Sequence, residues 1–344
     1  MREYILESPG LVTEREAPVL QPEPGMVQIR VKHVGICGSD IHLFQGTYNG
    51  PHHYPMLFGH EWSGQVTAIG EGVTGVSVGD IVTGDCSRYC GSCPACKMDK
   101  NLCEHIEKFG ITTDGASAEY ITREEKYLYK GGEGLSEELL VLSEPLAVAA
   151  HLLSRTARAA EGALKDRNIL VLGGGVIGMG AMMLLRKIYH CETVALYDLS
   201  RYRCEIARSA GAEIPTAEAL HPQAEDGSYA SLYQAACYDI VIETTGVPSV
   251  FASAFPLLKT MGILACVGMA AKVEIPQKQI VTKALTVLGS IGGTGDFPTA
   301  MKFIHDFPEE ARKLISHSYP MTRVKEAFEA ARKPEESMKV VLDL

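Results

Sequence analysis

Residues 168–178 read NILVLGGGVIG, an apolar run that passes through three consecutive glycines into a second apolar run. The glycines follow the pattern G-x-G-x-x-G between a predicted strand and a predicted helix. Such glycines permit a tight turn, the close approach of a pyrophosphate and tight helix–strand packing, while the helix N-terminus offers N–H groups to the phosphates. A glycine-rich turn without a nucleotide is the alternative. The candidate cofactor-binding residues here are Gly173, Gly175, Val176, Ile177 and Gly178.

A carboxylate follows at the distance that a dinucleotide site requires. Asp198 lies twenty residues after Gly178, at the end of the next apolar run, 193–197. There it would accept hydrogen bonds from ribose hydroxyls and repel a 2′-phosphate, which favours NAD over NADP. Arg201 and Arg203 follow closely, and because arginine can bind a 2′-phosphate, NADP remains an alternative.

Strand and helix patterns alternate around this stretch, which predicts a parallel sheet covered by helices on both faces. Polar residues 216–229 are expected to form a surface insertion. The predicted strands lie at 168–172, 193–197, 239–243, 262–267 and 284–289, and the predicted helices at 176–188, 201–210 and 249–258. The chain is expected to end with helices near 297–316 and 323–332 and a strand at 339–342.

The first 130 residues are rich in glycine, proline and short β-branched runs. Residues 27–32 alternate apolar and polar side chains, as a half-buried strand does, and 63–70 and 79–83 read similarly. They predict a β-rich unit, barrel-like or sandwich-like. Helical character begins near residue 136 and is clearest at 144–153, where a proline stands in the first turn. A chain of 344 residues also favours two domains.

Composition excludes several classes of protein. The formal net charge of −10 argues against nucleic acid or an anionic membrane as a partner, because both require a basic face. No window approaches about 18 uninterrupted apolar residues, so no transmembrane helix is expected. The N-terminus, MREYILESPGLVTERE, lacks the basic-then-apolar pattern of a secretory signal. We therefore expect a cytoplasmic protein.

Five of the ten cysteines fall within residues 86–103. Four of them, Cys90, Cys93, Cys96 and Cys103, would satisfy a tetrahedral zinc completely and leave no open position, so they predict a structural zinc site. A redox C-x-x-C pair or free thiols are the alternatives. Cys86 is expected to be a bystander to this lobe.

Residues 34–64, VGICGSDIHLFQGTYNGPHHYPMLFGHEWSG, hold a second candidate metal site. A thiolate, a neutral imidazole and a carboxylate are ligand types that suit zinc, and fewer than four protein ligands would leave a position for water or substrate. A buried structural cysteine with nearby histidines is the alternative. The candidate catalytic residues of this stretch are Cys37, Ser39, His42, His60 and Glu61.

Taken together, the motifs resemble the zinc-dependent medium-chain dehydrogenase/reductase family, in the branch of sorbitol, threonine and related polyol dehydrogenases. The motifs are GICGSDIH (35–42), GHEWSG (59–64), the four-cysteine lobe (90–103), DGASAEY (114–120), EPLAVAAH (144–151), GGGVIG (173–178) and KALTVLGS (283–290). The resemblance implies an α/β protein with a GroES-like catalytic domain over 1–150 and a Rossmann cofactor domain over 151–285. Residues 286–344 would return to the catalytic domain.

The same resemblance implies catalytic zinc on Cys37 and His60, with Glu61 as a third ligand. Glu144 would be a further ligand or would hold a zinc-bound water. Because adjacent strand residues point in opposite directions, the choice between Glu61 and Glu144 stays open. The lobe departs from the family pattern, since Cys96 and Cys103 enclose six residues instead of seven.

In this family zinc acts as a Lewis acid on the substrate hydroxyl, hydride passes to the nicotinamide, and a relay carries the proton to solvent. Ser39 and His42 match that relay. Ser39 could instead cap a helix that starts at Asp40, and His42 could be a surface residue. Asp40 is expected to anchor structure.

The substrate is expected to be a polyhydroxylated small molecule, because the loop that would form the pocket wall is polar and bears histidines. A polyol, sugar alcohol or cyclitol would be oxidised at a secondary hydroxyl to a ketone with NAD. The alternatives are an aminocyclitol, which resemblances in 59–64, 109–120 and 283–293 suggest, and an L-threonine-like amino alcohol. The expected wall residues are Tyr48, His52, His53 and Phe58, opposite residues 291–293.

A non-catalytic zinc protein that binds nucleotide as a sensor is the alternative from another functional class. An intact relay argues against it, because a binding module has no use for one. Relatives in this family are dimers or tetramers that often pair through the edge strand of the Rossmann sheet, here 284–289. A homodimer or homotetramer is therefore expected.

Overall fold

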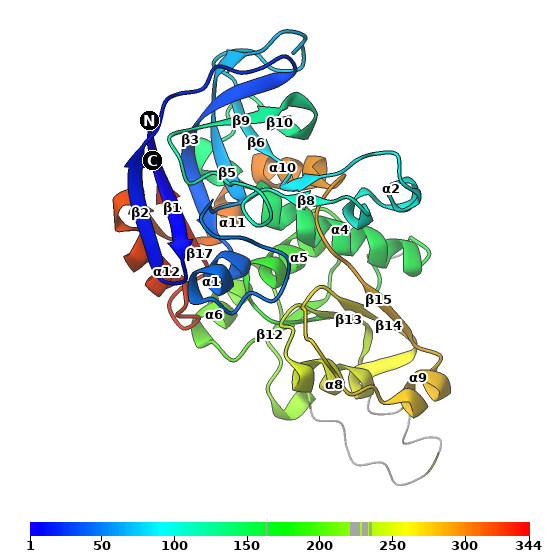
Figure 1. The fold of residues 1–344 in the computed structure, drawn as a ribbon. Helices are drawn as coiled ribbons and strands as arrows, with labels where there is room; N and C mark the ends of the chain where they lie inside the picture. Colours follow the sequence, from blue (N-terminus) through cyan, green and yellow to red (C-terminus); the bar gives the residue numbers. More distant parts are fainter. Residues whose placement is uncertain (163, 221–227, 229–232, 234–235) are drawn as a thin grey trace. The chain divides into compact units, whose positions relative to one another are not determined.

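The computed structural model describes residues 1–162, 164–220, 228, 233 and 236–344. The chain forms two compact units, one of Met1–Ala147 with Gly292–Leu344 and one of Val148–Ile291 (Figure 1). Helix α4 (Ser143–Ala159) begins in the first unit and ends in the second. Most of the expected polar insertion at 216–229 lies outside the described residues, and its start holds a short 3-10 helix, η3 (Glu218–Leu220).

The first unit is β-rich, as the alternating patterns predict. Its largest sheet has seven strands in the order β10-β6-β5-β3-β17-β16, with β9 also paired to β3. A three-stranded sheet has the order β2-β1-β4. The strands are β1 (Arg2–Ser8), β2 (Leu11–Glu16), β3 (Met26–Ile36), β4 (Met56–Leu57), β5 (Glu61–Ile69), β6 (Ile81–Gly84), β7 (Ser87–Arg88), β8 (Glu107–Lys108), β9 (Tyr120–Glu124), β10 (Leu128–Lys130), β16 (Ile315–Pro320) and β17 (Lys339–Asp343).

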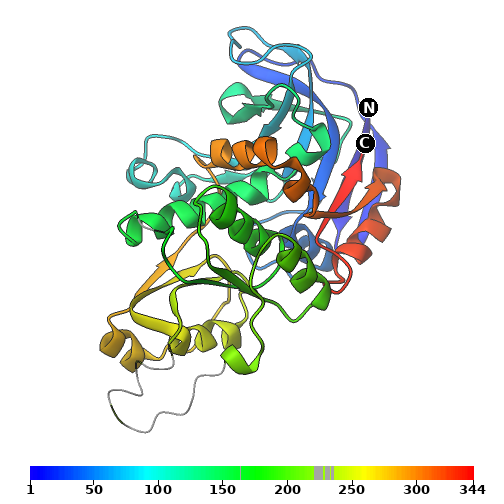
Figure 2. The same ribbon diagram turned by 180° about the vertical axis from the view of Figure 1, so that it is seen from behind.

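Short helices connect and cover these strands. They are α1 (Gly38–Gln45), α2 (Pro94–Met98), η1 (Lys100–Leu102), η2 (Glu125–Tyr127), α3 (Glu137–Leu140), α10 (Phe297–Asp306), α11 (Pro308–Arg312), η4 (Met321–Arg323) and α12 (Val324–Ala331). The C-terminal strand β17 lies beside β3, antiparallel to it, so strands from distant parts of the sequence pair in one sheet (Figures 1 and 2). That pairing brings residue 340 opposite residue 36, next to the first candidate metal ligand.

The second unit contains the predicted parallel sheet. Its strand order is β12-β11-β13-β14-β15, and every pair is parallel. The inner strand β11 is an unbroken buried apolar run, as expected where helices cover both faces. The elements are β11 (Ile169–Leu172), α5 (Val176–Lys187), β12 (Val194–Tyr197), α6 (Arg201–Ser209), β13 (Tyr238–Glu243), α8 (Pro248–Leu257), β14 (Leu258–Cys266), α9 (Gln277–Lys283) and β15 (Thr286–Gly289).

The predicted strands and helices of this unit differ from the observed ones by one or two residues at several ends, and by more at one. The strand expected at 262–267 begins four residues earlier, because Leu258 already pairs with Tyr238 of β13. Helices α5 and α6 pack on β11 and β12, whereas α8 and α9 pack on β13 and β14. The chain therefore leaves β11 and β13 toward different neighbours, which makes the gap between these strands the topological switch point, where open α/β sheets bind ligands.

Candidate metal centres and cofactor site

Helix α1 places the first candidate ligand. Cys37 is the N-cap of the helix, and its backbone N–H donates to Asp40 Oδ2 at 2.8 Å. Asp40 is fully buried and also accepts from the backbone N–H of Gly59 at 3.3 Å. The alternative in which Ser39 caps a helix starting at Asp40 is therefore wrong, because the helix begins at Gly38. Asp40 ties together the two segments that carry Cys37 and His60.

The structure brings three of the candidate ligands together. Ligand atoms of Cys37, His60 and Glu61 all lie within 4.8 Å of one another. His60 and Glu61 are adjacent in sequence, yet both face this point because His60 immediately precedes strand β5 and Glu61 opens it. Both side chains are buried, and among the described residues Glu61 Oε1 has no hydrogen-bond partner. Sulfur, nitrogen and oxygen donors with an unsatisfied buried oxygen fit a zinc ion.

The electrostatics of the cluster also fit a cation. His60 Nδ1 lies 3.7 Å from Asp40 Oδ1. Burial lowers the pKa of the His60 imidazole, but the Asp40 carboxylate and the Cys37 thiolate outweigh it and raise that pKa well above its usual value. A site that favours positive charge this strongly in a buried position suits a divalent metal.

Lys339 is a site residue that sequence reasoning missed. It opens β17, and its ammonium donates to Glu61 Oε2 and, at 3.0 Å, to the backbone oxygen of Ile36. Burial lowers the pKa of Lys339, whereas Glu61 and Cys37 raise it, with a net rise. Gly35 makes room for the pair, since a Cβ there would lie 2.4 Å from Glu61 Oε2. No motif surrounds Lys339, so only the β3–β17 pairing reveals it.

Glu144 lies beside this cluster but outside the set of mutually close donors. It is buried in the first turn of α4, and its Oε1 accepts a hydrogen bond from Cys86 Sγ at 3.2 Å. Burial raises the pKa of Glu144, and the His60 imidazole opposes that rise, while Glu61 adds to it. Cys86 stands outside the four-cysteine group, and its contact with the second candidate site was not expected.

Ser39 and His42, the candidate relay, lie three residues apart on α1 and therefore share one face of the helix. Ser39 Oγ is buried and has no hydrogen-bond partner among the described residues. His42 is exposed, and its Nδ1 lies 2.9 Å from Thr47 Oγ1. A buried hydroxyl followed by an exposed imidazole is an arrangement that can pass a proton outward.

The expected wall residues divide into two groups. Tyr48 is half-buried, and burial, followed by the charges of Cys37 and Asp40, raises the pKa of its phenol. The ring of His52 contacts Tyr48 edge-on at 5.6 Å, and His53 is exposed. The expectation for Phe58 is wrong, because its ring is buried in the core, 5.5 Å from Phe328.

The four-cysteine lobe has the geometry of a tetrahedral thiolate site. The Sγ atoms of Cys90, Cys93, Cys96 and Cys103 all lie within 4.8 Å of one another. Cys90 Sγ lies 3.9 Å from Cys96 Sγ and 3.6 Å from Cys103 Sγ. These separations are too long for disulfides and match the edge of about 3.8 Å that Zn–S bonds of about 2.3 Å imply. The loop with six residues between its last two cysteines closes around this point.

Backbone N–H groups in the lobe donate hydrogen bonds to cysteine sulfurs, which stabilises the thiolate form. The N–H of Cys93 donates to Cys90 Sγ, and the N–H of Cys96 donates to Cys93 Sγ, each at 3.4 Å. Backbone hydrogen bonds from Ser92 and Cys93 lower the pKa of the Cys90 thiol to about 5. Thiolates are the form that binds zinc.

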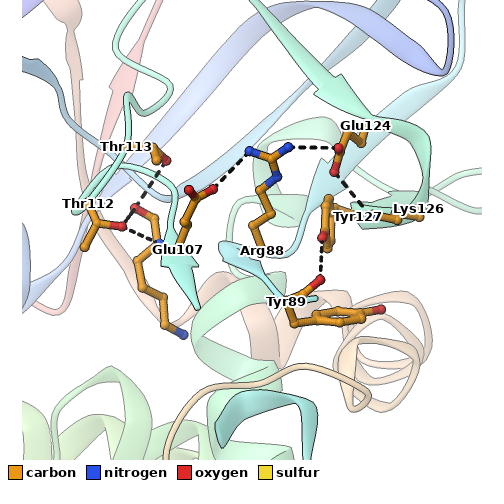
Figure 3. Close-up of polar contacts among 9 residues, drawn as sticks. Arg88, Tyr89, Glu107, Thr112, Thr113, Glu124, Lys126 and Tyr127 are labelled. Atoms are coloured by element: carbon orange, nitrogen blue, oxygen red, sulfur yellow. Dashed lines mark hydrogen bonds and ion pairs between the residues drawn. The ribbon is translucent and has the colours of Figure 1, made fainter. Parts of the chain in front are cut away.

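Strand β7 anchors the lobe where the chain enters it. Figure 3 shows Arg88 between two carboxylates, with Nη1 3.0 Å from Glu107 and Nη2 3.2 Å from Glu124. Next to it, the hydroxyl of Tyr127 donates to the backbone oxygen of Tyr89 at 3.0 Å. Arg88 thereby joins β7, which leads into the lobe, to β8, which follows it, and the contact with Tyr127 holds Tyr89 at the start of the lobe.

Replacing Cys96 by serine is expected to remove one zinc ion per chain and to lower the midpoint of thermal unfolding, because zinc binding at a structural site contributes folding free energy. Metal analysis and a thermal melt measure both effects. Cys237→Ser, at an exposed position outside the lobe, is the control and should change neither. Unchanged zinc content in Cys96→Ser would contradict a zinc site here.

The glycine turn of the second unit has the shape that a dinucleotide requires. Gly173 has φ +102°, and a Cβ at Gly178 would lie 1.9 Å from the backbone oxygen of Gly173. Gly175 is the N-cap of α5, so the N–H groups of Val176 and Ile177 belong to the first helical turn. The turn follows β11 at the switch point, which makes it a fitting cradle for a pyrophosphate.

Asp198 stands directly after β12 and holds this turn. Its Oδ2 accepts from the backbone N–H of Gly174 at 2.6 Å, and its Oδ1 accepts from the N–H of Ser200 at 2.7 Å. Arg203 Nη1 lies 3.9 Å from Asp198 Oδ2. The carboxylate is thus fixed beside the glycine turn, as the sequence spacing predicts for a ribose-binding acid.

Two family models match most of the chain. The model described as alcohol dehydrogenase GroES-like domain matches residues 23–133, and the model described as zinc-binding dehydrogenase matches residues 176–306. Sorbitol dehydrogenase of Halalkalibacterium halodurans is 33% identical over 97% of this chain and 96% of its own. D-arabitol-phosphate dehydrogenase of Enterococcus avium is 31% identical over 92% and 89%. L-threonine 3-dehydrogenase of Saccharopolyspora erythraea is 29% identical over 96% of both chains.

Solved structures match the whole fold. An alcohol dehydrogenase of Escherichia coli, RspB, complexed with NADH has a TM-score of 0.86 at 27% identity, covering 100% of this chain and 99% of its own. A zinc-binding dehydrogenase of Sinorhizobium meliloti bound to NADP has the same TM-score, identity and coverage. Within the described residues, no helix has the length and apolar character needed to cross a membrane.

Proposed function

The chain belongs to the zinc-dependent medium-chain dehydrogenase family and is an oxidoreductase that acts on CH–OH groups, and we propose that it oxidises a secondary hydroxyl of a polyol, sugar alcohol or cyclitol to a ketone with hydride transfer to NAD. The predicted family and the GroES-like plus Rossmann fold are confirmed. Zinc and a nicotinamide cofactor follow from the family, and a small-molecule alcohol is the substrate that such dehydrogenases take.

The buried cluster of Cys37, His60 and Glu61 is the observation that carries this proposal. Zinc bound there would supply the Lewis acidity that lowers the pKa of a substrate hydroxyl. Ser39 would take the proton that this hydroxyl releases, and His42 would deliver it to solvent from the exposed side of α1. Glu144 would act beside the cluster, either on the metal or on a water molecule next to it.

The substrate class rests on the loop beside the cluster. Tyr48 and His52 offer a hydroxyl and an imidazole where a pocket wall is expected, which suits a substrate with several hydroxyl groups. The relatives act, by their names, on sorbitol and D-arabitol phosphate. An L-threonine-type amino alcohol is the second candidate, because an L-threonine 3-dehydrogenase matches 96% of the chain.

The cofactor preference rests on Asp198, whose fixed carboxylate would repel a 2′-phosphate. Asp198→Asn removes the charge and keeps one of the two oxygens that accept backbone N–H groups, so we expect the ratio of kcat/KM for NAD to that for NADP to fall about tenfold or more, about 1.4 kcal/mol of discrimination. Steady-state assays with both cofactors measure it. Glu205→Gln, which removes an exposed charge from the following helix α6, should leave the ratio unchanged. An unchanged ratio in Asp198→Asn would contradict the role of Asp198.

We also propose a homodimer or homotetramer. Strand β15 is an edge of the parallel sheet, and apolar side chains are exposed on it and on the preceding helix, Val287 at 44% and Val281 at 64%. An unpaired edge strand with apolar neighbours is a surface on which a second copy can add its own edge. Light scattering measures the assembly, and a monomer at assay concentration would contradict this proposal.

A cytoplasmic location is proposed too, because zinc thiolate ligands require reduced cysteines.

The direct test is formation of reduced nicotinamide by the zinc-loaded protein. NAD and NADP would each be combined with sorbitol, xylitol, inositols, a 2-deoxy-aminocyclitol, L-threonine and butanediol. Turnover of a polyol or cyclitol with NAD is the expected result. Turnover of L-threonine alone would replace the proposal by the second candidate, and turnover of the aminocyclitol alone would narrow the substrate to that class. No turnover with zinc bound at both sites would overturn it.

A further inference from the structure

We propose that Cys86 is a positioning residue of the reaction, whose thiol holds the Glu144 carboxylate in place beside the catalytic metal site. The inference rests on the proposed function for the role of Glu144 and on the geometry for the contact. Cys86 Sγ donates to Glu144 Oε1 at 3.2 Å, and both side chains are buried, with exposures of 4% and 6%. One carboxylate oxygen is thereby engaged, and the other remains for the metal or for a water molecule.

The turn that carries Cys86 is held from several sides. The backbone N–H of Phe109 donates to the oxygen of Cys86 at 2.9 Å, and the N–H of Ser87 donates to Asp85 Oδ1 at 2.8 Å. The guanidinium of Arg123 donates to the oxygen of Asp85 at 2.9 Å and stacks 4.0 Å from the Phe109 ring. A thiol mounted on such a turn has a fixed position, which is what orienting a carboxylate requires.

Charge explains why a thiol suits this place. Glu144 is within electrostatic reach of both His60 and Glu61. A cationic partner at position 86 would compete with the metal for Glu144, and an anionic one would repel both carboxylates. A thiol is a weak neutral donor, so it orients Glu144 without changing the charge that the metal meets.

Three variants distinguish an orienting role of the Cys86 thiol toward Glu144 from a contribution to packing alone. Cys86→Ala removes the donor, and Cys86→Ser restores one as a hydroxyl. Cys191→Ala is the matched control, because Cys191 is equally buried and donates to a backbone oxygen, that of Leu164, at 3.3 Å in the other unit. For each variant the rate at which a chelator removes the catalytic-site metal is measured, along with kcat/KM and the visible spectrum of the cobalt-substituted protein.

Outer-shell partners of metal sites are worth about 10- to 100-fold in affinity or activity. We therefore expect Cys86→Ala to accelerate release of the catalytic-site metal by about tenfold, to lower kcat/KM by a similar factor and to shift the cobalt bands. Cys86→Ser should recover most of each effect, and Cys191→Ala should show none. In a Glu144→Gln background, Cys86→Ala should add little, because the two residues act as one unit.

Metal release from Cys86→Ala that equals that of Cys191→Ala would overturn the inference, as would full additivity of Cys86→Ala with Glu144→Gln. Metal release and the cobalt spectrum need no turnover. A wild-type protein that binds metal but oxidises none of the alcohols would therefore sink the proposed function while the contact between Cys86 and Glu144 is still tested.

Discussion

Lys339→Met is expected to lower the free energy of unfolding by about 3–5 kcal/mol, because removal of one member of a buried ion pair leaves the other charge without compensation. Lys339 and Glu61 have side-chain exposures of 4% and 1%, so water cannot replace the lost partner. Methionine keeps the length and apolar stem of lysine, which confines the change to the ammonium group. Urea unfolding with zinc in the four-cysteine lobe alone measures the effect, because a metal ion on Glu61 would compensate the charge that Lys339 leaves behind.

Two further variants show whether the lost stability comes from the uncompensated buried charge. Lys302→Met removes the cation of an exposed pair with Asp306 on α10 and should cost less than about 1 kcal/mol. Combining Lys339→Met with Glu61→Gln removes both buried charges and should recover part of the lost stability. A loss in Lys339→Met no larger than in Lys302→Met would show that the buried pair does not contribute to stability as the structure implies.

Cys37→Ala is expected to lower kcat/KM by about 1,000-fold or more, because loss of the catalytic metal removes several kcal/mol of charge stabilisation in the transition state. Nicotinamide affinity should be unaffected, since Gly173, Gly178 and Asp198 lie in the second unit. Steady-state assays measure turnover, and fluorescence titration with NADH measures cofactor binding. Zinc content should fall by one ion per chain while the four-cysteine lobe keeps its own.

Cys191→Ala, a buried cysteine in the second unit, is the control for the loss of a thiol and should keep full turnover. Circular dichroism establishes that Cys37→Ala is folded. If folded Cys37→Ala turns over at a rate within tenfold of the wild type, the catalytic metal does not depend on Cys37, and the site has to be sought elsewhere.

Much of the fold and of the candidate sites can be predicted from local sequence patterns. Gly173, Gly178 and Asp198 predict the cofactor turn because the shape of a βαβ unit is set within about 30 consecutive residues. The lobe of Cys90 and its partners is equally local, since four ligands within one short loop can meet without the rest of the fold. The strands of the parallel sheet can also be predicted from the sequence, because they are buried apolar runs between glycines and helices.

Local sequence patterns do not predict contacts between distant segments of the chain. Lys339 reaches Glu61 only because β17 pairs with β3, which brings together residues 278 positions apart. Cys86 reads as a spare thiol until the start of α4 places Glu144 against it. Strand register and helix placement are decided by the packing of the whole core, and a buried charge or thiol acquires its partner only when that packing is complete. Residue types and spacing thus determined the chemistry available to this chain, whereas tertiary structure decided which side chains hold its acidic groups in place.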